Sequence, residues 1–99
     1  GKPMIKHIVM WKFKDDVAEA DKLEMKRQLE SLKGVVPSLL QIEIGMDVVG
    51  ADASKDMVLT TLFNSLSDLQ AYADDPAHLK VVEFVKPLVC ERAVVDYEI

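Results

Sequence analysis

The sequence predicts an α+β fold built on a four-stranded antiparallel sheet. Three observations indicate it. Four segments show the apolar alternation of strands, the segments between them show helical spacing, and 99 residues with 49% hydrophobic side chains suffice for one core. We therefore expect residues 1–99 to form a single domain. Residues 1–3, which precede Met4, are interpreted as a remnant of the expression vector.

Residues 4–13 have the pattern of the first strand, because β-forming side chains dominate and alternate. The period of two places His7, Val9, Trp11 and Phe13 on one face. The other face also carries apolar residues between its lysines.

Residues 16–33 follow as a predicted helix. Asp16 is in the position of an N-cap, with Glu19 three residues later as in a capping box. Gly34 is typical of the residue that stops a helix. One apolar stripe at helical spacing is expected to face the sheet: Ala18, Met25, Leu29 and Leu32.

Two further strands are predicted over residues 39–49 and 57–63. The first alternates apolar and polar residues, which favours a strand with one buried face. The second is apolar on both faces and is therefore expected in the centre of the sheet. A polar turn would join them.

The last third predicts a helix broken in two and a closing strand. Ser65 or Ser67 would cap the first piece, and Pro76 suits the first position of the second, which ends at Pro87. Residues 88–99 alternate again as a strand. The complete order, β-α-β-β-α-β, is that of the ferredoxin-like fold, in which both helices cover one face of the sheet.

The opposite face of this sheet predicts a homodimer. The strand over residues 4–13 is apolar on both faces, which is more apolar surface than a sheet with one solvent-exposed face needs. A second copy packed face to face would cover the surplus, so we expect a dimeric α/β barrel.

Net charge and cysteine content limit the classes of binding partner and the cellular compartment that we expect. A net charge of −5 argues against nucleic acid, and no apolar run reaches the length of a membrane span. Cys90 is the single cysteine and cannot form an intrachain disulfide, so we expect a reducing, cytoplasmic setting. Its place in a strand predicts a packing role.

Only two histidines, His7 and His78, can supply imidazole chemistry near neutral pH. The start of a helix disfavours a charged imidazole, so His78 would stay neutral and available as a base. Tyr72 precedes it by six residues, and a phenol beside it could polarise a carbonyl during proton removal. The alternatives are a half-buried strand histidine for His7 and a surface residue for His78.

Other chemistries have less support. Asp74 and Asp75 lie near His78, but no second set of ligands accompanies them, so no metal site is expected. The glycines are too dispersed for a phosphate-binding loop. We expect no cofactor.

Two segments resemble the stress-responsive A/B barrel (Dabb) family. Residues 6–15, KHIVMWKFKD, resemble its opening strand, and residues 75–81, DPAHLKV, resemble its second signature, with Asp75 where a histidine is more usual. The closing pair Asp96-Tyr97 also fits. The resemblance spans nearly the whole chain from Met4 and implies a ferredoxin-like subunit that dimerises sheet to sheet.

The resemblance extends to a plant polyketide cyclase of this family, which implies roles for individual residues. Its histidine base, the tyrosine that orients it and a pocket histidine on the first strand match His78, Tyr72 and His7. A further pocket histidine and a pocket tyrosine fall on Met57 and Leu29, where this sequence departs from it. The implied substrate-binding set is His7, Val9, Trp11, Leu29 and Met57.

The sequence therefore supports two candidate functions of different classes. The first is a small lyase or cyclase in which His78 removes a proton from a β-keto or polyketide-like compound. The second is a module that binds a small apolar or aromatic ligand without chemistry. Related dimeric barrels that oxidise quinols or degrade haem form a third class with less support. Whether the chain is an enzyme is left open by the sequence.

Overall fold

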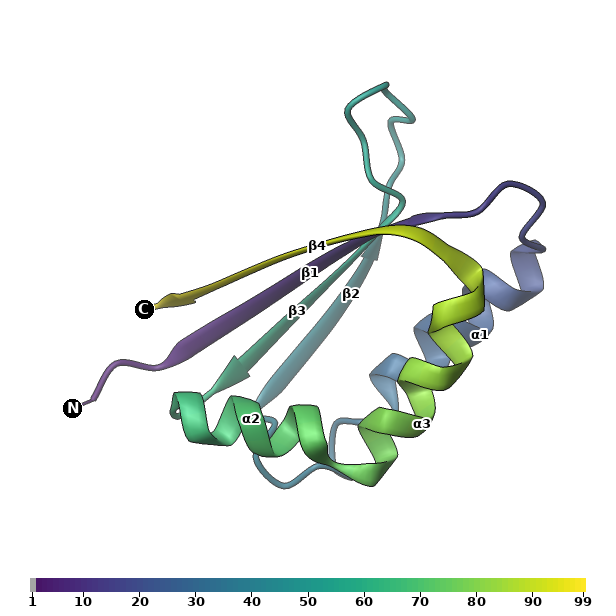
Figure 1. The fold of residues 1–99 in the computed structure, drawn as a ribbon. Coiled ribbons are helices and arrows are strands. Elements are labelled where there is room, and N and C mark those ends of the chain that lie inside the picture. The colour runs from purple at the N-terminus through teal and green to yellow at the C-terminus, as the bar shows by residue number, and fades with distance from the viewer. Residues whose placement is uncertain (1) are drawn as a thin grey trace.

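Four antiparallel strands form one sheet in the order β2-β3-β1-β4 in the computed structural model, which describes residues 2–99. The helices α1, α2 and α3 lie together on one face of this sheet (Figure 1). The elements are β1 (Ile5–Phe13), α1 (Glu19–Glu30), β2 (Gln41–Met46), β3 (Met57–Phe63), α2 (Leu66–Asp74), α3 (Pro76–Val85), the 3₁₀ turn η1 (Lys86–Leu88) and β4 (Val89–Glu98). The predicted ferredoxin-like βαββαβ fold is confirmed.

The core lies between the helices and the two central strands. In β3 every second side chain is buried, from Met57 to Phe63, and the inward row of β1 contributes Val9 and Trp11. Residues on alternate positions of a strand share one face, so this row is the one that meets the helices. The prediction that residues 57–63 form a central strand is confirmed.

Helix α1 begins at Glu19, two residues later than the predicted N-cap at Asp16 implies. Asp16 has a φ of 66° and lies in the turn that leads from β1 to the helix, while Ala18 is the N-cap and makes no side-chain cap. The chain must reverse direction before it can return over the sheet, and this turn uses the residues expected in the helix. Ala18 is consequently exposed, whereas Met25, Leu29 and Leu32 are buried as predicted.

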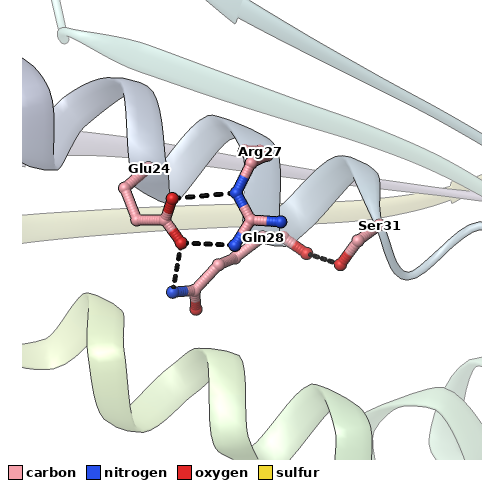
Figure 2. A network of polar contacts seen from close by, with 4 residues as sticks. All are labelled: Glu24, Arg27, Gln28 and Ser31. Atoms are coloured by element: carbon pink, nitrogen blue, oxygen red, sulfur yellow. Dashed lines mark hydrogen bonds and ion pairs between the residues drawn. The ribbon is translucent and has the colours of Figure 1, made fainter.

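Helix α1 carries a network of polar contacts (Figure 2). The Arg27 guanidinium donates to both oxygens of Glu24, at 2.8 and 2.6 Å, and the Gln28 amide donates to the same carboxylate at 2.9 Å. These hydrogen bonds, from Arg27 first and then Gln28, lower the pKa of Glu24 to about 2. Ser31 donates to the Gln28 carbonyl at the end of the helix.

Strand β2 is shorter than the predicted 39–49. The Asp47 carboxylate accepts from the backbone N–H of Val49 and of Gly50, which turns the chain away from the sheet. The loop that follows projects beyond the end of the sheet (Figure 1), and Val48 is fully exposed there.

Each of the two helices α2 and α3 begins with a side-chain cap, and the one at Ser65 is one of the two predicted. Ser65 Oγ accepts from the Asp68 N–H at 3.1 Å at the start of α2, and the Asp75 carboxylate accepts from the Ala77 N–H at 2.8 Å at the start of α3. Pro76 is the first residue of α3, as predicted. These contacts mark where each of the two helices begins.

Ser65→Ala is expected to lower the free energy of unfolding by about 1 kcal/mol, because the Asp68 N–H loses its only side-chain acceptor. Urea denaturation followed by circular dichroism measures this. Ser67→Ala is the matched control, since its hydroxyl contacts only that of Ser65. Equal stability of the two variants would contradict the assigned cap.

Strand β4 contains an irregularity that changes the role of Cys90. Lys12 pairs with Glu91 but Phe13 pairs with Val89, so Cys90 is an extra residue in the edge strand. Its thiol donates to the Phe13 carbonyl at 3.5 Å and is exposed. The predicted packing role of Cys90 is wrong for this chain, because a bulge on an edge strand leaves its side chain outside the core.

The sheet face opposite the helices carries exposed apolar side chains. Residues that pair across antiparallel strands share one face, which places Met10 beside Val58 and Ala93, and Ile8 beside Val95. Met10, Val95 and Tyr97 are 41%, 54% and 44% exposed. We call this set, Ile8, Met10, Val58, Val95 and Tyr97, the open face.

Candidate functional site

A cavity of about 620 Å³ lies between the sheet and the helices. This volume is within the range of small-molecule sites. Strands β1, β3 and β4 form one wall, and α1, α2, α3 and η1 form the other. Six residues singled out from the sequence line it: His7, Val9, Trp11, Leu29, Tyr72 and His78.

Met57, the seventh candidate, does not line this cavity. It is buried at the start of β3, opposite Trp11 in the sheet. The register places Leu59, the partner of Val9, at the cavity wall instead.

Tyr72 is held on α2 with almost no exposure, at 2%. Its ring packs 5.2 Å from that of Phe63 and 4.4 Å from that of His78, measured between centroids. Its hydroxyl has no hydrogen-bond partner within residues 2–99. Burial raises the pKa of Tyr72 to about 12, so the phenol remains a hydrogen-bond donor at neutral pH.

His78 lies in the first turn of α3, half-buried against the cavity, and is therefore not a surface residue. Its Nδ1 is 3.1 Å from the Ala73 carbonyl oxygen. A carbonyl only accepts, so Nδ1 carries the proton and Nε2 presents a lone pair. Burial lowers the pKa of His78, opposed by the hydrogen bond to Ala73 and assisted by the charges of His7 and Arg92. The neutral form therefore dominates at pH 7.

His7 faces the same cavity from β1 and is paired with Asp96. Its Nδ1 is 2.5 Å from Asp96 Oδ1, and its side chain is 12% exposed. The two residues are opposite each other in the β1–β4 register, and the His7 ring centroid is 6.3 Å from that of Tyr72. His7 is thus a satisfied, half-buried strand histidine that also lines the cavity.

Sequence reasoning did not identify Asp96 or Arg92 as site residues. Both are on the inward row of β4 and line the cavity. The alternation of residues 88–99 places them on one face, but only the pairing register shows which residues of β1 they meet.

The two acidic residues near His78 make local hydrogen bonds. The Asp75 carboxylate caps α3, and Asp74 accepts from the Gln70 amide. Within residues 2–99 no three histidine, cysteine, aspartate or glutamate side chains come together in a way that could hold a metal ion.

None of the helices in that range is both long and apolar enough to traverse a bilayer.

Comparison with known proteins identifies relatives along the whole chain. The model of the stress responsive A/B barrel domain family matches residues 5–99. The chain is 25% identical over 95 residues to olivetolic acid cyclase from Cannabis sativa, covering 94% of each protein.

Solved structures share the fold. A dimeric ferredoxin-like protein from Bacteroides fragilis is 29% identical with a TM-score of 0.82, covering 97% of this chain and 96% of the other. A dimeric ferredoxin-like protein from Thermobifida fusca is 22% identical with a TM-score of 0.89, covering 98% and 92%.

Proposed function

The chain belongs to the stress-responsive A/B barrel domain family, and from this premise we propose that it is a small lyase or cyclase that removes a proton next to a carbonyl group. The substrate class we propose is a β-keto or polyketide-like compound. The similarity to a plant cyclase along nearly the whole chain supports this class of reaction.

The observation that carries the proposal is the arrangement of Tyr72 and His78. A buried phenol without a partner is costly, about 1–3 kcal/mol, unless a ligand supplies the missing acceptor. Beside it is an imidazole whose Nδ1 proton is engaged by Ala73, so that Nε2 is the atom left to take a proton. A donor and a base therefore adjoin one cavity.

In the proposed step, the C–H bond next to the carbonyl breaks and its proton moves to His78 Nε2. The electron pair of that bond moves into the carbonyl, which becomes an enolate. The Tyr72 hydroxyl donates a hydrogen bond to the developing oxyanion. The enolate then either attacks a second carbonyl of the same molecule or expels a leaving group, and the His78 imidazolium returns the proton.

The walls of the cavity fit such a substrate. Val9, Trp11 and Leu29 supply apolar surface, and His7 supplies a polar contact held in place by Asp96. Met57 is not part of the proposed binding set, because it lies outside the cavity lining.

Deuterium exchange tests the proposal without knowledge of the final product. A panel of aryl ketones and β-keto esters is incubated in D₂O with and without the protein, and the loss of the proton next to the carbonyl is followed by NMR. We expect at least one member to exchange faster with protein than with buffer. No acceleration across the panel would contradict the proposed chemistry.

The alternative function, binding without chemistry, draws support from the mostly apolar lining. Residues from α3 and β4 such as Val81, Val85 and Val94 add to that wall. This function predicts ligand-dependent thermal stabilisation by the same panel with no exchange. Acceleration of exchange would exclude it.

We also propose that the working unit is a homodimer joined through the open face. Exposed apolar side chains clustered on one sheet face favour burial against a second copy. The relative from Bacteroides fragilis is described as dimeric, which supports the same assembly here.

Val95→Asp is expected to convert the dimer to a monomer at micromolar concentration, because it would bury a carboxylate within the contact of each copy. Light scattering coupled to size-exclusion chromatography gives the mass. Leu79→Asp is the matched control, since Leu79 is 50% exposed but lies on α3. A wild-type monomer would refute the proposed assembly.

A further inference from the structure

The charged residues around the cavity point to the kind of substrate it takes. Resting on the proposed function, we propose that Arg92 binds a carboxylate of the substrate, at a distance from the carbon that His78 deprotonates. The cavity would thus accept an anionic keto compound with its charge and its reacting carbon at opposite ends.

The cavity has two chemically different ends, set by the register of the sheet. Asp96 is opposite His7 and Arg92 is opposite Trp11. Four residues of strand separate Arg92 from Asp96, or about 13 Å between their Cα atoms. One end therefore holds the His7–Asp96 pair, and the other holds Arg92.

Helix α3, on the opposite wall of the cavity, separates His78 from Lys86 by a similar length. His78 is in its first turn, and Lys86 follows its last residue. Eight residues of helix span about 12 Å. Both Lys86 and Arg92 line the cavity, and η1 connects α3 to β4 between them. By backbone position, Lys86 and Arg92 thus lie toward the end of the cavity away from His78, and the charge of Arg92 still reaches His78 through the cavity.

Arg92 is available to a ligand. Within residues 2–99 no carboxylate lies within 4 Å of its guanidinium, and it makes no hydrogen bond there. Asp96 is the only acidic residue among those lining the cavity, and it is engaged by His7. In a chain of net charge −5, the cavity therefore carries a local excess of positive charge.

A carboxylate suits this group and this place. The guanidinium presents two parallel N–H donors that match a carboxylate. A negative charge next to the reacting carbon would oppose carbanion formation, whereas one held by Arg92 lies away from it. The arrangement thus separates recognition of charge from the chemistry at His78 and Tyr72.

Calorimetric titration with 4-phenylbutanoate and with its neutral analogue 4-phenylbutanamide tests the inference. We expect the wild-type protein to bind the acid about tenfold more tightly than the amide. This preference should weaken as NaCl is raised, because salt screens a partly exposed pair. Arg92→Gln should abolish the preference, chiefly through weaker binding of the acid, and Arg92→Lys should retain part of it.

Lys80→Gln is the control for charge removal, since Lys80 is exposed on α3 and does not line the cavity. It should keep the wild-type preference. Equal wild-type binding of the two probes, an unchanged preference in Arg92→Gln, or no binding of either probe would overturn the inference. Its failure is distinguishable from that of the proposed function, because the exchange assay uses neutral ketones and depends on His78 rather than Arg92.

Discussion

His78→Gln is expected to lower the protein-dependent rate of proton exchange by about 10²–10⁴-fold. Glutamine can keep a hydrogen bond to the Ala73 carbonyl but has no basic nitrogen to replace Nε2. NMR exchange of the most responsive ketone of the panel gives the rate. Far-UV circular dichroism and the melting temperature should match those of the wild type, because the side chain is only half-buried.

The pH dependence of the same rate gives a second check on His78. The base acts only when unprotonated, and burial lowers its pKa below 6.5. The wild-type rate is therefore expected to be level at neutral pH and to fall only in acid below pH 6.5, as Nε2 gains a proton. The variant should lose this acid limb. A rate that is unchanged in His78→Gln would remove His78 from the mechanism.

Tyr72→Phe is expected to slow exchange by about 10²-fold while leaving stability unchanged or higher. The rate falls because the oxyanion loses its donor. Stability does not fall, because the removed hydroxyl is buried without a partner and the ring contacts with Phe63 remain. Exchange NMR and urea denaturation measure the two quantities on the same sample.

Tyr97→Phe is the control for this variant, since it removes a phenol from the open face rather than from the cavity. Its exchange rate should equal that of the wild type. A marked loss of stability in Tyr72→Phe would mean that the hydroxyl is bound within the fold, and its assignment as a ligand donor would then be withdrawn.

Much of the fold could be predicted because its signals are local. The bounds of β3 match the apolar run over residues 57–63, and Ser65 and Pro76 mark helix starts through contacts within three residues. Tyr72 and His78 could be placed together for the same reason, since only one helix break separates them.

Where the prediction was wrong, a non-local requirement decided the outcome. Asp16 has the chemistry of a cap, but the chain needs it in the turn that leaves β1. Cys90 has the neighbours of a packed strand residue, but the β1–β4 pairing makes it a bulge. Neither requirement is visible within a window of the sequence.

The sequence by itself determined the order of elements, the alternation within β1 and the Tyr72–His78 spacing, because hydrophobic period and capping chemistry act over a few residues. Only the tertiary structure decided that His7 meets Asp96, 89 residues away, and that Arg92 shares their cavity. Register and packing are properties of the assembled sheet and helices, so they settle which of the chemically able residues come together.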